Sequence, residues 1–128
     1  MFSEAWLKQF QQRVNADPEM HVIGRWLTLA FSLTSSDTRA IVRFEAGRLV
    51  ETILSPRLDV RCAFGFRAND EIWSRFLGQD PPPLYHDFFA MLMRVPQFTL
   101  EGDTLVAMQH ARALHRVMNL MRSAEQPA

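Results

Sequence analysis

The sequence has one cysteine, Cys62, and no excess of charge of either sign. A lone cysteine forms no internal disulfide and no cysteine metal site, which is typical of a reducing compartment. Its place in an apolar, strand-like pattern favours a buried structural role over a nucleophile. The 14 basic and 14 acidic residues balance, so the chain lacks the net charge that draws proteins to nucleic acid or to anionic lipid surfaces. We therefore expect no nucleic-acid partner.

Targeting and membrane-spanning segments are also missing. No apolar run approaches the ~20 residues that span a bilayer, and the chain does not open on a basic segment followed by an apolar one. The end of the sequence, residues 125–128, differs from the Ser-Lys-Leu peroxisomal signal. These absences predict a cytoplasmic protein without stable membrane insertion. With 128 residues, 48% of them hydrophobic, the chain is expected to form one domain over residues 1–128.

Catalytic and metal-binding motifs are absent as well. The sequence has no Gly-rich phosphate loop, no G-x-S-x-G elbow and no H-E-x-x-H motif. His110 and His115 are spaced i, i+5, and side chains at that spacing on a helix diverge by about 140°, too far to hold one ion. His86 and Asp87 could form an acid/base couple, although an Asp at a helix start is favoured by the helix dipole alone. We favour that second interpretation and expect no enzyme, no metal and no cofactor.

The hydrophobic pattern changes its period twice along the chain. A period of about 3.6 residues predicts a helix over residues 3–15, capped by Ser3 and followed by a turn or second short helix up to Gly24. A period of two then predicts four strands joined by short turns, which implies an antiparallel sheet. The helical period returns after Asn69, a candidate helix cap. The expected strands cover residues 25–33, 40–45, 49–54, 59–68 and 98–100, and the later helices cover 70–77, 84–94 and 104–122.

The last two predicted helices carry the most apolar surface. Residues 88–93 are all apolar, so this helix needs to be covered on every side, by protein alone or by protein and a bound apolar molecule. In the helix over 104–122, half of the circumference is apolar and the other half is polar or charged. The apolar half consists of Val106, Ala107, Ala111, Ala113, Leu114, Val117, Met118, Leu120 and Met121.

His110 falls inside that apolar half. An imidazole there needs a partner, because leaving it unpaired costs on the order of 1–3 kcal/mol. The partner is either a protein group or the polar end of a ligand. The sequence also has seven methionines, whose unbranched side chains adapt to apolar shapes of several kinds, in a flexible core or in a binding pocket.

Several stretches between Trp26 and Met121 resemble the sterol carrier protein family, whose members are single lipid-binding domains of about this size. They are Phe44-Glu45-Ala46-Gly47 before a strand, Asp59-Val60 at the start of the next, Phe76-Leu77-Gly78 at a helix end, and Phe98-Thr99-Leu100-Glu101-Gly102-Asp103 before an apolar helix. The resemblance implies an α+β fold with a five-stranded, mostly antiparallel sheet covered on one face by about five helices. It also implies an apolar tunnel between the sheet and the C-terminal helices, and it brings no catalytic residues.

We therefore expect the chain to bind or carry a lipid-like ligand, such as a fatty acyl chain, a sterol or an isoprenoid, with His110 or an arginine orienting its polar end. Phe88 and Phe89 are large enough to narrow the tunnel or to fill it. The alternative is an interaction module whose apolar helices form a homodimer or dock on an enzyme of lipid, steroid or quinone metabolism. The residues expected to line the tunnel are Phe64, Phe76, Phe88, Phe89, Met91, Leu92, Phe98, Leu100, His110, Leu114, Val117, Met118 and Met121.

Overall fold

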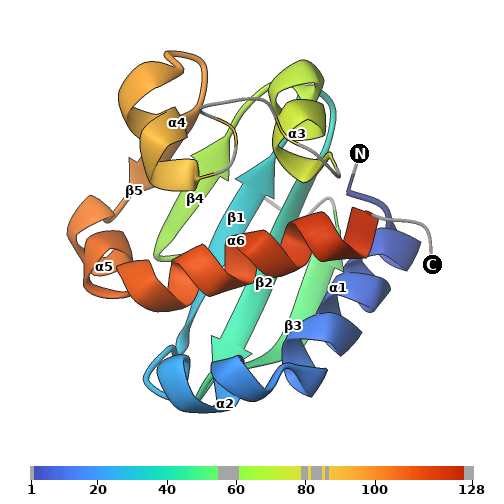
Figure 1. The fold of residues 1–128 in the computed structure, drawn as a ribbon, viewed down its shortest axis with the longest axis vertical. Helices are drawn as coiled ribbons and strands as arrows, with labels where there is room; N and C mark the ends of the chain where they lie inside the picture. The colour runs from blue at the N-terminus through green and yellow to red at the C-terminus, as the bar shows by residue number, and fades with distance from the viewer. Residues whose placement is uncertain (1, 55–60, 79–80, 82–84, 86, 126–128) are drawn as a thin grey trace.

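The fold is a five-stranded sheet with helices packed across one of its faces (Figure 1). The computed structural model describes residues 2–54, 61–78, 81, 85 and 87–125. The strand order is β3-β2-β1-β4-β5, and the last helix, α6 (Ala111–Glu125), runs across the sheet in front of β1 and β2. The predicted α+β class, with a mostly antiparallel five-stranded sheet, is confirmed.

Two helices form the N-terminal part of the described chain, and the first has the cap that the sequence predicts. Helix α1 (Glu4–Ala16) begins after Ser3, whose hydroxyl accepts a hydrogen bond from the Trp6 N–H at 3.1 Å. Asp17 ends this helix and caps the next, α2 (Pro18–Ile23), by accepting from the Met20 N–H at 3.1 Å. The apolar stripe of α1 is buried against the rest of the core, which is the face that the helical period predicts.

The first three strands form an antiparallel meander. They are β1 (Leu29–Thr34), β2 (Arg39–Glu45) and β3 (Arg48–Leu54). The predicted first strand starts too early, because residues 24–27 form a turn in which the Leu27 N–H donates to the Gly24 carbonyl at 2.8 Å. Gly47, between β2 and β3, has a φ of 81°, and a Cβ there would lie 2.6 Å from the Gly24 oxygen. The turn therefore requires glycine at that position.

The fourth strand breaks the predicted antiparallel order. Strand β4 (Phe64–Arg67) pairs parallel to β1 and antiparallel to β5 (Thr99–Gly102), so the chain crosses the sheet between β3 and β4. The predicted strand over 59–68 is also too long at its start. Residues 61–63 lie outside the strand, although the Ala63 N–H still donates to the Ala30 carbonyl and the Ala63 carbonyl accepts from the Asp103 N–H. Residues 59–60 lie outside the described part of the chain.

Of the later helices, the first has its predicted bounds and the others differ from the prediction. Helix α3 (Asp70–Leu77) follows its predicted cap, Asn69, which accepts from the Ile72 N–H at 2.9 Å. Helix α4 (Phe88–Arg94) begins later than predicted, because Tyr85 lies in a turn and Asp87 is the cap. Residues 84 and 86 fall outside the described residues. The predicted helix over 104–122 is two helices, α5 (Thr104–Gln109) and α6, which makes six helices in the described part of the chain instead of about five.

A row of phenylalanine side chains crosses the covered face of the sheet. The rings of Phe44 on β2, Phe31 on β1 and Phe64 on β4 are stacked in sequence, with centroids 5.7 and 5.2 Å apart. All three side chains are buried. Burial of aromatic surface on this scale dominates core energetics, so the sheet face needs the cover that the helices supply.

A buried ion pair holds α6 against the N-terminal helices. The Arg116 guanidinium donates to both carboxylate oxygens of Asp17, at 2.9 and 2.6 Å, and the Asp17 side chain is only 7% exposed. The hydrogen bond from Arg116 is the main cause that holds the pKa of Asp17 below its ordinary value of 3.8. The same carboxylate caps α2, so one side chain joins three helices.

Replacing Arg116 with alanine is expected to lower the free energy of unfolding by about 2 kcal/mol at neutral pH, because the Asp17 carboxylate then stays buried without its cation. Since the pKa of Asp17 is depressed in the folded state, this stabilisation is present above pH 3.8 and is lost as the pH falls through the folded-state pKa. Urea unfolding of wild type and variant at neutral and at acid pH measures both effects.

The matched control for this prediction is Arg112→Ala, at an exposed position of the same helix. It should change the free energy of unfolding by less than about 0.5 kcal/mol. A loss in Arg116→Ala that stayed the same at acid pH would contradict the assignment to the ion pair.

Candidate ligand-binding site

The residues expected to line a tunnel come together in one buried apolar cluster between the sheet and helices α3, α4 and α6. We call it the sheet–helix cluster. Phe89, Leu92 and Leu100 are half-buried and pack against it, and His110 is also half-buried. Nine of the predicted tunnel residues are at most 2% exposed: Phe64, Phe76, Phe88, Met91, Phe98, Leu114, Val117, Met118 and Met121.

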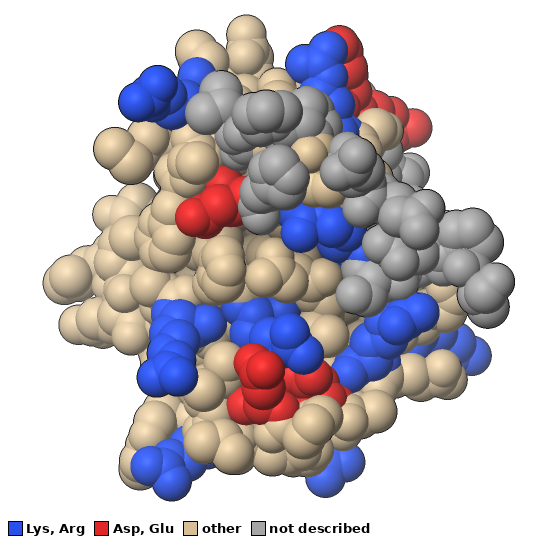
Figure 2. All heavy atoms as spheres, in the orientation of Figure 1, with Lys and Arg blue, Asp and Glu red and all other residues tan. Residues whose placement is uncertain are grey.

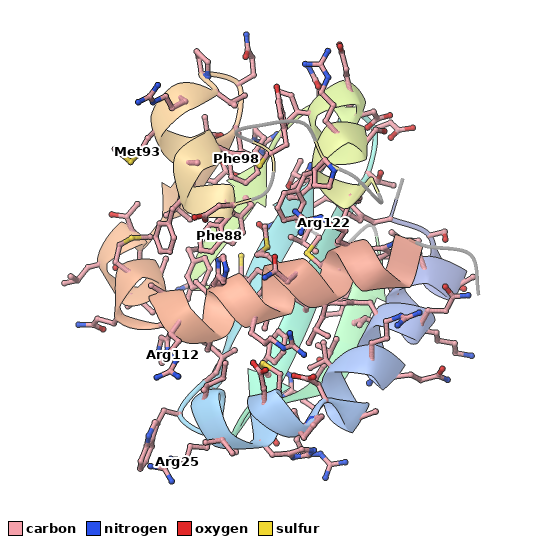
Figure 3. The ribbon with its side chains drawn as sticks, in the orientation of Figure 1. Arg25, Phe88, Met93, Phe98, Arg112 and Arg122 are labelled. Carbon is pink, nitrogen blue, oxygen red and sulfur yellow. The ribbon has the colours of Figure 1, made fainter. Side chains whose placement is uncertain are left out.

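Aromatic rings connect the two layers of the cluster directly. Phe66 of β4 lies 5.6 Å from the ring of Phe88 on α4 and 5.9 Å from the ring of Phe98 before β5. Figure 3 shows Phe88 and Phe98 on the side of α4 that faces the sheet. Phe88 therefore occupies space between α4 and β4 that an apolar ligand would need. Its size suggested two roles, narrowing the tunnel or filling it, and this position is compatible with either.

Two aromatic members of the cluster were missed as site residues. Phe66 lies on the same strand face as Phe64, and that alternation was the signal that could have found it. Trp73, on α3, is fully buried, with its ring 5.6 Å from Phe98 and its Nε1–H donating to the Thr34 carbonyl at 2.9 Å. It belongs to the apolar stripe of that helix, but sequence alone does not show that the stripe reaches β5.

Protein does not cover helix α4 on every side, so the first of the two expected arrangements, cover by protein alone, is wrong. Phe88 and Met91 are buried, whereas Phe89, Ala90 and Leu92 are half-buried and Met93 is 84% exposed. The helix lies on the surface of the fold, with one face against the sheet–helix cluster and the opposite face outward (Figure 3). The run of apolar residues therefore supplies both a core face and an exposed apolar face.

His110 lies at the break between α5 and α6. It is therefore not part of the continuous apolar stripe that the sequence predicted. Its backbone, with φ −108° and ψ 22°, ends α5, and its N–H donates to the Ala107 carbonyl at 3.1 Å. The prediction assumed one continuous helix, and the break changes the direction of this side chain. In the part of the chain that the structure describes, its imidazole makes no hydrogen bond, so a role toward a ligand stays a prediction.

A carboxylate and an imidazole lie at the N-terminal end of α4. Asp87 caps the helix by accepting from the Phe89 N–H at 2.9 Å, which is the structural role that we favoured for it. Its carboxylate is also 3.7 Å from Nδ1 of His115 on α6, with both side chains 46% exposed. His86 lies outside the described residues, so the His86–Asp87 couple is not observed. No group of three metal-ligating side chains occurs among the described residues.

Arg122 holds a positive charge at the edge of the cluster (Figure 3). Its guanidinium donates to the carbonyl oxygens of Phe76 and Tyr85, at 2.8 and 3.1 Å, and lies 4.8 Å from the centre of the Phe76 ring. Burial lowers the pKa of this guanidinium from its ordinary value. A third hydrogen bond joins its guanidinium to the Asn119 side-chain oxygen at 3.3 Å, so Arg122 ties α6 to α3 and to the turn at Tyr85.

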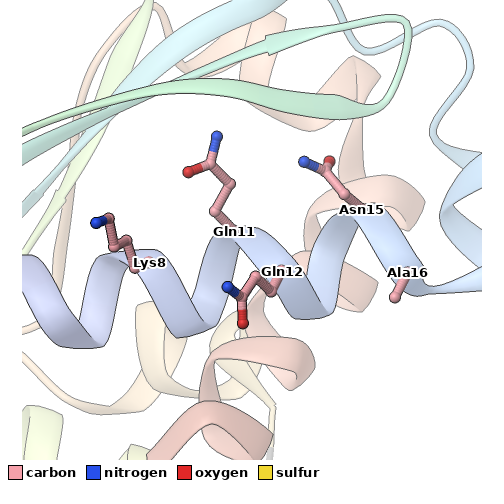
Figure 4. A pocket seen from close by; sticks show the side chains of 5 residues that line it. All are labelled: Lys8, Gln11, Gln12, Asn15 and Ala16. Carbon is pink, nitrogen blue, oxygen red and sulfur yellow. The ribbon is translucent and has the colours of Figure 1, made fainter.

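Two open hollows that are lined by described residues lie outside this cluster. One of about 560 Å³ runs along α1 and is lined by Lys8, Gln11, Gln12, Asn15 and Ala16 (Figure 4). The amides of Gln11 and Asn15 in it donate to the Leu49 carbonyl, so they join α1 to β3. A second hollow, of about 210 Å³, lies at β1, β4 and β5 and shares only Phe64 with the cluster's predicted residues.

Cys62 and Arg39 line that second hollow, with the guanidinium 3.9 Å from the thiol sulfur. Cys62 is half-buried and precedes β4, so the prediction that it lies within a strand is wrong. None of the helices within the described ranges has the length and apolar content of a membrane span.

Comparisons with solved structures identify the fold. The crystal structure of sterol carrier protein 2 matches with a TM-score of 0.77 and 15% identity, over 95% of this chain and 97% of that one. The solution structure of a conserved hypothetical protein from Thermus thermophilus matches with a TM-score of 0.78 and 14% identity, over 100% of this chain and 92% of that one. A structure described as "UbiJ-SCP2 Ubiquinone synthesis protein" matches with a TM-score of 0.57 and 11% identity, over 89% and 90%.

In sequence comparisons, no protein-family model and no curated protein matches the chain. At identities of 11 to 15%, the structural similarity shows the fold and nothing finer. The resemblance read from the order of the sequence motifs is confirmed at the level of the fold.

Replacing Phe88 with alanine is expected to lower the free energy of unfolding by about 3–5 kcal/mol, because the ring is buried between α4 and β4 and its removal leaves a cavity. Phe89→Ala is the matched control. Its half-buried side chain should cost roughly half as much or less. Denaturant unfolding of both variants tests this, and equal losses would show that Phe88 does not fill the interlayer space.

Proposed function

We propose that this chain, whose fold is that of sterol carrier protein 2, binds and carries a lipid-like apolar ligand between its sheet and its C-terminal helices. The observation that carries the proposal is the sheet–helix cluster, in which buried apolar side chains from β4, α3, α4 and α6 meet in one place. The ligand class is a fatty acyl chain, a sterol or an isoprenoid. The third solved structure, which is described as a ubiquinone synthesis protein, supports including isoprenoids.

The cluster is suited to opening around a ligand because of its methionines. Met91 comes from α4 and Met118 and Met121 from α6, and all three are fully buried. Their unbranched side chains change rotamer at small cost and can refill space of a different shape. Each 100 Å² of apolar ligand surface buried there would contribute about 2.5 kcal/mol to the free energy of binding. This gain offsets the cost of moving side chains such as Phe88.

Polar groups at the rim of the cluster would orient the ligand. His110 and the Asp87–His115 pair lie at the α4 and α5 end of α6 and suit a hydroxyl or carbonyl oxygen. None of these arrangements calls for a catalytic step, and the proposed activity is binding without turnover.

A second candidate function is a protein interaction module. Met93, Leu105 and Met108 are exposed large apolar side chains on α4 and α5, which is a feature of surfaces that form homodimers or dock on other proteins. An enzyme of lipid, steroid or quinone metabolism is the partner class for this version. Light scattering separates the two, because a strict monomer that retains lipid supports the carrier.

Native mass spectrometry of freshly purified protein is the direct test of the carrier. We expect an added mass that is lost on denaturation and that extraction identifies as a lipid. Titration with a fluorescent fatty acid and a fluorescent sterol supplies the second measurement. Protein that is purified empty and takes up neither probe would contradict the proposed function.

Met91→Asp and Leu114→Asp are expected to weaken binding of a fluorescent fatty acid by at least about tenfold, because each puts a charge in the buried cluster. Arg112→Ala, on the exposed side of α6, should leave the affinity unchanged. Arg116 is unsuitable as this control, since it pairs with Asp17 and its loss loosens α6.

Circular dichroism and urea unfolding must accompany these titrations, because charges in a core also destabilise the fold. The conservative change Met91→Leu keeps the cluster apolar and should retain binding. Loss of binding in Arg112→Ala equal to that in the buried variants would show that the ligand does not enter the sheet–helix cluster.

A further inference from the structure

A buried serine lies on the face of the sheet that is opposite to the sheet–helix cluster. Strand alternation turns Phe31 and Leu33 of β1 toward the cluster, so Ser32 between them faces the other way. Helix α6 lies in front of the sheet in Figure 1, so the space-filling view of Figure 2 shows the helix-covered side, and the face that carries Ser32 is the far one. Ser32 is only 2% exposed, yet its hydroxyl makes no hydrogen bond within the described part of the chain. A buried hydroxyl without a partner costs stability, so its position needs a reason.

Ser32 lines the hollow of about 210 Å³ at β1, β4 and β5, together with Arg39 and Cys62. Across the sheet, Ser32 pairs with Gly65 of β4, and Gly65 pairs with Glu101 of β5. A Cβ on Gly65 would collide with the Ser32 oxygen, so this glycine leaves the room that the hydroxyl occupies. The sheet beside the hydroxyl is therefore bare backbone, which a small ligand can approach closely.

Arg39 brings a positive charge to the same hollow. Its guanidinium lies 3.9 Å from the Cys62 sulfur and has no carboxylate partner among the residues that the structure describes. Because a thiol is only a weak hydrogen-bond acceptor, most donors of this guanidinium stay available. The acidic side chain that lines the hollow, Glu101, is held by Arg67 through two contacts, at 3.2 and 3.3 Å. The described side chains at the hollow therefore leave one positive charge without a counterpart.

We propose that this hollow is a binding site for a small molecule with one carboxylate group. The Arg39 guanidinium would donate to the carboxylate oxygens, and the Ser32 hydroxyl would donate a hydrogen bond to one of them. One uncompensated cation suits a single negative charge, whereas a phosphate dianion would also be repelled by Glu101. The hollow is smaller than the ~300 Å³ at which sites for drug-sized ligands begin, which favours a small metabolite over a fatty acyl chain or a sterol. The site lies on the other face of the sheet and does not rest on the proposed carrier function.

Cys62 supplies a reporter at the site itself, because it is the sole cysteine of the chain and lines the hollow. Iodoacetate and iodoacetamide alkylate the same thiol, but only iodoacetate carries a carboxylate. We expect the ratio of their rates, iodoacetate over iodoacetamide, to be at least about tenfold higher in the folded protein than in the chain unfolded in urea, since a charge-assisted hydrogen bond contributes on that scale. Mass spectrometry of the intact protein measures both rates.

Two substitutions of arginine locate the charge that is responsible. Arg39→Gln should return the ratio to the value of the unfolded chain. Arg61→Gln is the matched control, because it removes the same charge from the exposed residue next to Cys62, which does not line the hollow. It should leave the ratio high. Equal losses in the two variants would assign the preference to general electrostatic attraction and overturn the proposed site.

Ser32→Ala separates a binding role from a structural one. Because the hydroxyl has no partner in the described fold, removing it should leave the urea midpoint unchanged or raise it. The same change should lower the rate ratio by about tenfold, since one hydrogen bond to the carboxylate is lost. A lower midpoint with an unchanged ratio would show that the hydroxyl serves the sheet and not a ligand.

Protection of Cys62 in the wild-type protein tests the site without any variant. At constant ionic strength, acetate should slow the labelling by iodoacetamide in a saturable way, and acetamide should not. A wild-type rate ratio equal to that of the unfolded chain, or labelling that acetate does not slow, would overturn the proposal. Equal protection by inorganic phosphate would show a general anion site and overturn the assignment to a carboxylate. Uptake of the fluorescent fatty acid is measured separately, so failure of either proposal leaves the other standing.

Discussion

The parallel ladder between β1 and β4 joins two parts of the chain that local sequence keeps apart. On one side lies the meander of β1, β2 and β3, and on the other lie β5 and the C-terminal helices. The pairing sets Phe64 beside Phe31 and Phe66 beside Leu33, so the apolar face becomes continuous across the sheet. The ladder extends the apolar face from β1 and β2 to β4, so α4 and α6 cover one continuous surface and the sheet–helix cluster forms beneath them.

Local signals predicted most of the elements. Ser3 and Asn69 cap helices as their sequence positions indicate, and alternating apolar residues mark the strands. The errors fall where distant segments decide the structure. Alternation extends the predicted fourth strand to residue 59, whereas its ladder pairs with β1 and β5 begin at Phe64, just after the backbone bonds of Ala63 to Ala30 and Asp103. The parallel pairing of β4 is equally non-local, since nothing in residues 61–67 specifies which neighbour the strand takes.

The composition of the candidate site was more predictable than its shape. The apolar half predicted for the helix over residues 104–122 contains the buried residues of α6, because α6 is one continuous helix from Ala111 onward. It failed at His110, where the helix breaks. The space between the layers was beyond prediction, since it depends on how the Phe88 ring meets Phe66 across two elements. Ligand binding itself is an inference from the cluster and the fold.

The pair between Arg116 and Asp17 joins residues 99 positions apart in the sequence. Such a contact forms only after the chain has been made as far as α6, which follows every strand of the sheet. During synthesis on the ribosome, the phenylalanine row of the sheet therefore lacks the cover of α6 until that helix has emerged. Exposed apolar surface in such an intermediate is prone to aggregation, so we expect early docking of α6 to protect the growing chain.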